Sequence, residues 1–149
     1  MKTWIAITVI AVTALAFCGA ALAAVPDPLV MPNKTVGGGA FNQYTPGVAG
    51  GLGLHNIGLL IQTSGKVVAG ATNTTEKYFY INDGSDLDDT SGKIGLRVSY
   101  ANLATGKSIT PPADNTFVVI IGISSTTDLS GRIIPTLRPR NQTDIAPAP

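Results

Sequence analysis

The chain has 149 residues, with ten lysines and arginines, nine aspartates and glutamates, and a single histidine. This length suits one domain that can bury a real hydrophobic core, so disulfides are not needed for stability. The net charge near zero excludes a surface built as a whole to attract nucleic acid or anionic lipid.

Residues 1–23 have the features of a cleavable signal peptide. Lys2 gives a positive start, residues 4–17 form an apolar run, and residues 21–23 match the A-x-A cleavage pattern. The run is shorter than the roughly 20 residues of a membrane-spanning helix. We therefore expect a secreted, periplasmic or cell-surface protein that is not inserted in a membrane after cleavage. An uncleaved anchor is the alternative.

Cys18 is the only cysteine. The residues before it are close to a bacterial lipoprotein box, except that Phe17 stands where a small residue is expected, so lipidation of Cys18 stays an alternative. Cleavage after Ala23 would remove this cysteine and leave nine positive and nine negative side chains. The mature chain would then have no disulfide, cysteine metal ligand or cysteine nucleophile.

Residues 24–54 form an extension that is rich in glycine and proline. The stretch VGGGAFNQYTPGVAGGLGL has seven glycines in nineteen residues and no helical periodicity. This composition predicts loop or extended structure. Phe41, Tyr44 and Val48 are expected to anchor the extension on a domain, and a freely disordered linker is the alternative.

Five β-strands are predicted after the extension, from alternating or continuous apolar residues. They are expected at residues 57–69, 78–81, 94–100, 117–123 and 132–137. Gly65 is expected to bend the first strand, and Pro135 to mark an edge or an end of the last. The fourth, FVVIIGI, is expected to be buried on both faces.

The spacing of these strands, with no convincing helix and no internal repeat, predicts an all-β fold. A small five-stranded barrel over residues 55–140 fits it best. Residues 141–149 are expected to be a Pro/Ala tail.

Short stretches along the strands carry a resemblance to a known family. They are GKV (65–67), YFYINDGS (78–85), GLRV (95–98), VVIIGISS (118–125), GRII (131–134) and LRPR (137–140). Together they resemble the bacterial OB-fold family, in particular OB-type modules of secreted proteins. The resemblance implies an OB-like barrel with a Gly-rich extension packed on it. It leaves the ligand open, because OB barrels serve unrelated functions.

The outer face of the second and third strands is the candidate binding surface. Phe79 and Ile81 are expected to point into the barrel. Since successive side chains alternate, Tyr78 and Tyr80 then point outward. The resemblance implies that ligands bind on this face, whose expected members are Tyr78, Tyr80, Arg97, Ser99 and Lys66. Rings beside cations suit single-stranded nucleic acid, and sugars also stack on rings. A merely packed or solvated face is the alternative.

An acidic loop follows the second strand. It contains four aspartates, Asp83, Asp86, Asp88 and Asp89. Calcium prefers several oxygen ligands from a flexible loop. The EF-hand spacing and its closing glutamate are missing, so a solvated turn is favoured over a weak calcium site.

His55 is the only candidate for histidine catalysis. It has no cysteine partner and no serine in a recognisable nucleophile motif. The sequence therefore predicts a non-enzymatic module without a cofactor, which acts by binding a protein or glycan surface or by self-association. The alternative is single-stranded nucleic acid binding through the outer face.

Overall fold

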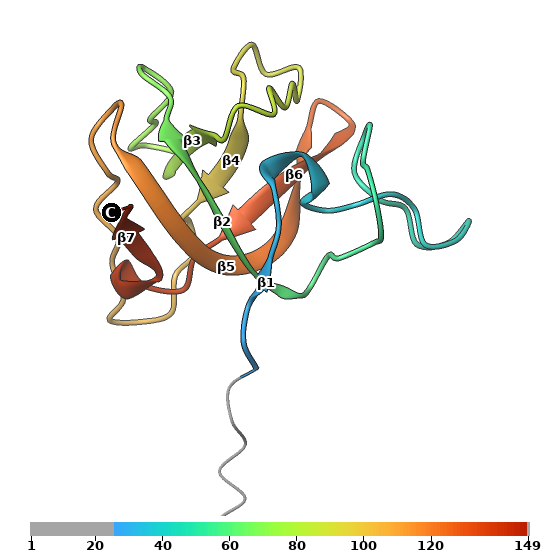
Figure 1. Ribbon diagram of the computed structural model, residues 1–149, viewed down its shortest axis with the longest axis horizontal. Helices are drawn as coiled ribbons and strands as arrows, with labels where there is room; N and C mark the ends of the chain where they lie inside the picture. The colour runs from blue at the N-terminus through green and yellow to red at the C-terminus, as the bar shows by residue number, and fades with distance from the viewer. Residues whose placement is uncertain (1–25, 149) are drawn as a thin grey trace, which may run out of the picture.

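The protein is all-β, as the sequence predicts, in a computed structural model that describes residues 26–148. The predicted signal peptide and Cys18 lie outside these residues. Seven strands form one sheet (Figure 1). They are β1 (Leu29–Val30), β2 (Leu60–Val67), β3 (Tyr78–Asn82), β4 (Leu96–Ser99), β5 (Phe117–Leu129), β6 (Arg132–Arg138) and β7 (Ile145–Pro147). Two short 3-10 turns, η1 (Asn33–Thr35) and η2 (Gln142–Asp144), complete the elements.

Five of these strands close on themselves, in the order β2-β3-β4-β6-β5 and back to β2. Closure comes from the antiparallel pairing of β2 with β5, which runs from Leu60↔Ile123 to Lys66↔Phe117. Only the β4–β6 pair within this ring is parallel. Each of the five predicted strands is present. The two short strands β1 and β7, which the sequence analysis missed, pair with β2 and β5 outside the ring.

The core lies inside this ring and is built by strand alternation. Phe79 and Ile81 of β3 point into it, as predicted, and meet Leu96 and Val98 of β4 and Ile120 of β5. All five side chains are completely buried. Burying each stabilises the fold by about 1.5–3 kcal/mol relative to leaving it exposed.

Two glycines let the long strands bend tightly. A Cβ on Gly65 of β2 would lie 2.9 Å from the carbonyl group of Asn82, and one on Gly122 of β5 would lie 2.8 Å from that of Arg138. The backbones can therefore approach only where no side chain intervenes. Just after Gly65, β3 begins to pair with β2 at Lys66, where β2 is still paired with β5 on its other edge. The predicted bend at Gly65 is thus a close backbone approach.

The strand β5 differs from its prediction in two ways. It continues to Leu129 rather than ending at residue 123, because the polar stretch SSTTD pairs with β6. Nor is it buried on both faces: Val118 and Ile120 are buried, whereas Val119 and Ile121 are only partly covered and Phe117 is exposed. The short strand β7 pairs with the edge of β5 from Val118 to Ile120, so it lies beside β5 in the sheet and not over its outer face.

Asn33 joins the extension to the barrel. Its buried side chain donates to the Ile81 carbonyl (3.1 Å) and accepts from the Thr63 hydroxyl (2.8 Å). Farther along, Ala49 N–H donates to the Ile133 carbonyl (2.8 Å). The extension is therefore ordered against β2, β3 and β6.

The expected anchors of the extension need a correction. Val48 is buried, but Phe41 and Tyr44 are 76% and 85% exposed. Hydrogen bonds and close glycine packing hold this part of the chain in place, so its rings are not needed as anchors.

The expected C-terminal tail is structured up to residue 147. Turn η2 leads into β7, which pairs with β5. Arg140 Nη2 contacts Asp144 Oδ1 at 2.8 Å, and Arg140 Nε donates to Asp144 Oδ2 at 3.0 Å. Within residues 26–148, no helix has the length and apolar character needed to cross a membrane.

Candidate functional site

Strands β3 and β4 place four of the predicted face residues side by side. Their register sets Tyr78 opposite Ser99 and Tyr80 opposite Arg97. Residues opposite one another share a face, so these four lie on the side away from the core. The predicted alternation is correct for this segment.

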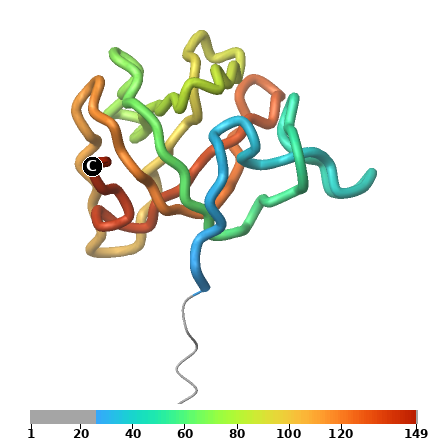
Figure 2. The backbone as a smooth tube through the Cα atoms, in the orientation of Figure 1, coloured from blue at the N-terminus to red at the C-terminus, as the bar shows by residue number. Residues whose placement is uncertain are grey.

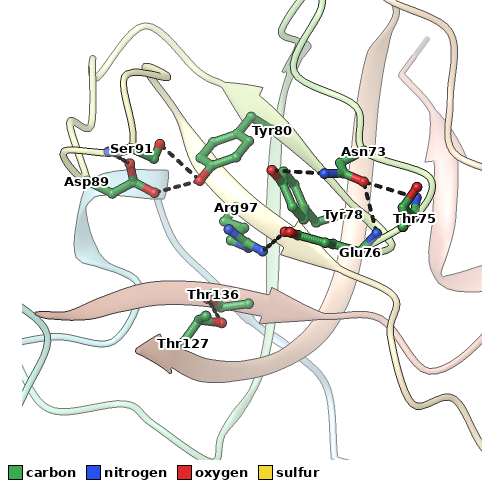
Figure 3. A network of polar contacts seen from close by, with 10 residues as sticks. All are labelled: Asn73, Thr75, Glu76, Tyr78, Tyr80, Asp89, Ser91, Arg97, Thr127 and Thr136. Carbon is green, nitrogen blue, oxygen red and sulfur yellow. Dashed lines mark hydrogen bonds and ion pairs between the residues drawn. The ribbon is translucent and has the colours of Figure 1, made fainter. Parts of the chain in front are cut away.

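Tyr80 is nevertheless not an exposed ring, which corrects the sequence analysis. It is 1% exposed, because the loop of residues 83–95 folds over it (Figure 3). Its hydroxyl donates to Asp89 Oδ2 at 2.8 Å and lies 3.1 Å from Ser91 Oγ. Burial raises the pKa of the Tyr80 phenol, and the Asp89 carboxylate acts in the same direction against the hydrogen bond with Ser91. The phenol therefore stays protonated and serves as a fixed donor inside the protein.

Arg97 is also committed to neighbours in its own chain. Its guanidinium carbon lies 3.6 Å from the centre of the Tyr78 ring, and its Nη2 lies 3.7 Å from Glu76 Oε2 (Figure 3). The side chain is only 11% exposed. Tyr78 also meets Tyr80 edge-to-face, with ring centres 5.9 Å apart. Stacking and ion pairing thus occupy the Arg97 cation, which the nucleic-acid alternative needs free to meet a phosphate.

The other two members of the predicted face do not complete a site. Ser99 is buried. Lys66 is exposed but stands opposite Asn82 and Phe117, beyond the tyrosine pair along β3. It lines a separate open pocket of about 480 Å³. The structure therefore brings Tyr78, Tyr80 and Arg97 together, with Ser99 beside them, and leaves Lys66 apart.

Glu76, Asp89 and Ser91 complete this network, and sequence reasoning did not find them as partners of the rings. Glu76 lies in the turn before β3, and the other two lie in the acidic loop. No spacing in the sequence links them to the outer face, because loops return to a sheet by tertiary packing. The arrangement holds a loop on a barrel and leaves little ring surface for a ligand.

The four aspartates of the acidic loop each have a structural role. Asp83 accepts from Asn33 N–H (2.8 Å), Asp86 from Asn82 Nδ2 (3.0 Å), Asp88 from Thr90 N–H (2.8 Å), and Asp89 from Tyr80. Burial alone would raise the pKa of Asp83, but hydrogen bonds from Ser85 and Asn33 outweigh it and lower that pKa. Across residues 26–148, no group of three or more such ligands gathers to hold a metal ion, so the calcium alternative gains no support.

His55 lies at the base of the extension. Its partly buried ring meets the Phe41 ring edge-on, with centres 6.5 Å apart. Asn56, next to it, is buried and accepts from Gly37 N–H (2.8 Å) and the Ser124 hydroxyl (2.7 Å). These contacts fix the entry of the chain into β2.

Residues 39–54, which we call the projection, carry the three most exposed large apolar side chains of residues 26–148. They are Leu54 (89% exposed), Tyr44 and Phe41, and Leu52 is also exposed. The projection stands out from the barrel at one end of the molecule (Figure 2). The sequence signal that could have identified it is the absence of Lys, Arg, Asp and Glu between Lys34 and Lys66.

The projection is held in one shape by its backbone. Gly39 N–H donates to the Gly53 carbonyl (3.1 Å), and Val48 N–H donates to the Gly38 carbonyl (3.1 Å). A Cβ on Gly51 would lie 2.1 Å from the Gly38 oxygen, so the two arms touch where only glycine fits. Rings on such a preorganised loop lose little conformational entropy when they bind.

Comparison of the chain with protein-family models, with curated proteins and with solved structures finds no match.

Proposed function

We propose that this protein is an exported, non-enzymatic OB-like module of the bacterial cell surface, periplasm or extracellular space, which acts by surface contact with a protein or glycan or with itself. Export is supported by the sequence of residues 1–23. The OB-like assignment is supported by the motif resemblance and by a ring of five strands, the number in an OB barrel.

The projection is the observation that carries the binding proposal. Phe41, Tyr44 and Leu54 are the three most exposed large apolar side chains of residues 26–148, and they stand within fourteen residues of one another on a single loop. Phe41 and Tyr44 are exposed on a backbone that glycine packing has already ordered. Aromatic side chains at the centre of an interface commonly carry most of its binding energy. We therefore propose the projection, rather than the outer face of β3 and β4, as the binding surface.

Nucleic-acid binding through the outer face is the less well supported alternative. It needs exposed rings and unpaired cations. Tyr80 is covered by the acidic loop and Arg97 is paired with Glu76, which leaves Lys66 as the exposed cation of the predicted set. If oligonucleotides bind after all, their affinity should fall steeply as salt rises.

A binding screen tests the proposed surface. The protein, purified after expression of the full chain, is presented to a glycan array, to extracellular proteins and to oligonucleotides. F41A/Y44A is expected to weaken binding of any protein or glycan ligand by about 30-fold or more, because each ring is a candidate interface anchor. I94A is the matched control, since Ile94 is an exposed apolar residue of the acidic loop.

The screen contradicts the proposal if F41A/Y44A retains every interaction of the wild type. It favours the nucleic-acid alternative if oligonucleotides bind and the substitution K66A abolishes that binding.

A further inference from the structure

One pocket of the barrel is lined by uncharged, mostly apolar residues, and the projection also has no Lys, Arg, Asp or Glu. The pocket has a volume of about 210 Å³ and is walled mainly by Pro112, Val118, Ile145 and Pro147. Thr110, Ala113, Thr116 and Gln142 complete its lining, so none of the described residues in its wall is charged. Four other pockets of the described chain each have at least one lysine or arginine in their walls.

The size of this pocket suits one aromatic ring. A protein cavity of about 150 Å³ lined by apolar side chains takes up benzene. The pocket here is somewhat larger and opens to the surface, so a ring on a protruding loop can enter it. Phe41 and Tyr44 are such rings, and the projection carries no charge that would lose hydration there.

The two features lie at opposite ends of the molecule. Figure 1 is drawn with the longest axis horizontal, and the projection is at its right end, while β7 and the described C-terminal residues, which wall the pocket, are at its left. The barrel stands between them. The projection therefore cannot fill the pocket of its own chain, whereas the projection of a second copy can.

We propose that the protein associates head to tail, with Phe41 or Tyr44 of one copy inserted in the pocket between β7 and the 110–118 segment of the next. This inference rests on the proposed function and names its partner as a second copy of the chain. Such a contact is heterologous, because it joins two different surfaces. A dimer therefore still has one free projection and one free pocket, and further copies can add until the oligomer closes on itself or forms a filament. One ring in one pocket makes a small interface, so we expect weak association that depends on concentration.

Two variants test the aromatic rings and the pocket separately. F41A/Y44A removes the rings and keeps the pocket. T110W fills the pocket and keeps the rings; Thr110 is exposed, and its backbone N–H, not its side chain, donates to Gln142 Oε1. A113W is a second blocking variant in case T110W disturbs the fold, and I94A is the control for loss of an exposed apolar side chain.

Sedimentation velocity from micromolar to millimolar concentration then gives the test. The wild type and I94A should form oligomers that lengthen with concentration. F41A/Y44A and T110W should each associate about 30-fold or more weakly and should be monomeric at the concentrations where the wild type first associates. An equimolar mixture of the two variants should form dimers and nothing larger, because only one productive contact remains.

Three results would overturn the head-to-tail contact. They are a wild type that stays monomeric throughout, a pocket-blocked variant that still associates through its rings, and a mixture that forms no dimers. If F41A/Y44A nonetheless loses a glycan or protein ligand in the binding screen, the proposed function stands and only the self-association is wrong.

Discussion

At the scale of single residues, Tyr80 shows the limit of strand alternation. The period of two correctly separates Tyr78 and Tyr80 from Phe79 and Ile81. Alternation predicts which face of the sheet a side chain lies on, but it does not predict whether a loop packs over that face. Here a loop supplies the Asp89 carboxylate, and a ring expected to face water becomes one of the largest fully buried side chains.

We expect Y80F to lower the free energy of unfolding by about 1–3 kcal/mol, because the buried Asp89 oxygen loses its donor. Y78F is the matched control: the Tyr78 hydroxyl lies 3.5 Å from Asn73 Nδ2, so its loss should cost less than about 0.5 kcal/mol. Urea denaturation of both variants measures the difference. Equal effects would contradict the buried hydrogen bond.

The Asp144–Arg140 pair should make stability depend on acid. Burial alone would raise the pKa of Asp144, but its hydrogen bonds with Arg140 outweigh burial and lower that pKa. A lowered pKa means stabilisation that is present above the ordinary aspartate value, about 3.9, and lost as the pH falls through the folded-state value.

We therefore expect D144N to lower the free energy of unfolding by about 2 kcal/mol at neutral pH, since three hydrogen bonds to a carboxylate weaken. The gap between variant and wild type should close as the pH falls below about 3.9. Thermal unfolding at a series of pH values checks this. A gap that stays constant with pH would show that the carboxylate charge contributes nothing.

At the scale of elements, the sequence predicts strands well where side-chain period or β-branched content is strong. All five ring strands appear near their predicted positions. The extent of β5 was missed because SSTTD resembles a turn, although its threonines pair with β6, where Thr136 Oγ1 donates to Thr127 Oγ1 at 2.9 Å. β1 and β7 were missed because strands of two or three residues have no measurable period.

Gly122 is a second close approach that the sequence analysis did not single out. G122A should destabilise the protein by about 1–3 kcal/mol, because the new Cβ would lie 2.8 Å from the Arg138 carbonyl group. G39A is the control, since its Cβ would meet nothing nearer than 3.4 Å. Chemical denaturation of both variants compares them; a G122A variant as stable as G39A would mean that the strands separate easily at this point.

At the scale of the whole molecule, the sequence predicts the fold class, but it does not predict which surface residues stay accessible to a binding partner. The outer face looked suitable because tyrosines and a cation share it, yet loops and an ion pair cover it. Phe41, Tyr44 and Val48 were expected to anchor the extension on the barrel, and only Val48 is buried. Exposure depends on contacts between distant segments, such as Ala49 with Ile133, and periodicity does not encode them.

The central claim is that contacts are made by the projection and not by the outer face of β3 and β4. Backbone amide chemical shifts of the wild type, recorded as its concentration is raised, test it most directly. We predict shifts that move together in residues 39–54 and in the pocket residues of 110–118 and 142–147, while Tyr78, Tyr80 and Arg97 stay unchanged. Movement at those three residues, with the projection unaffected, would contradict the account.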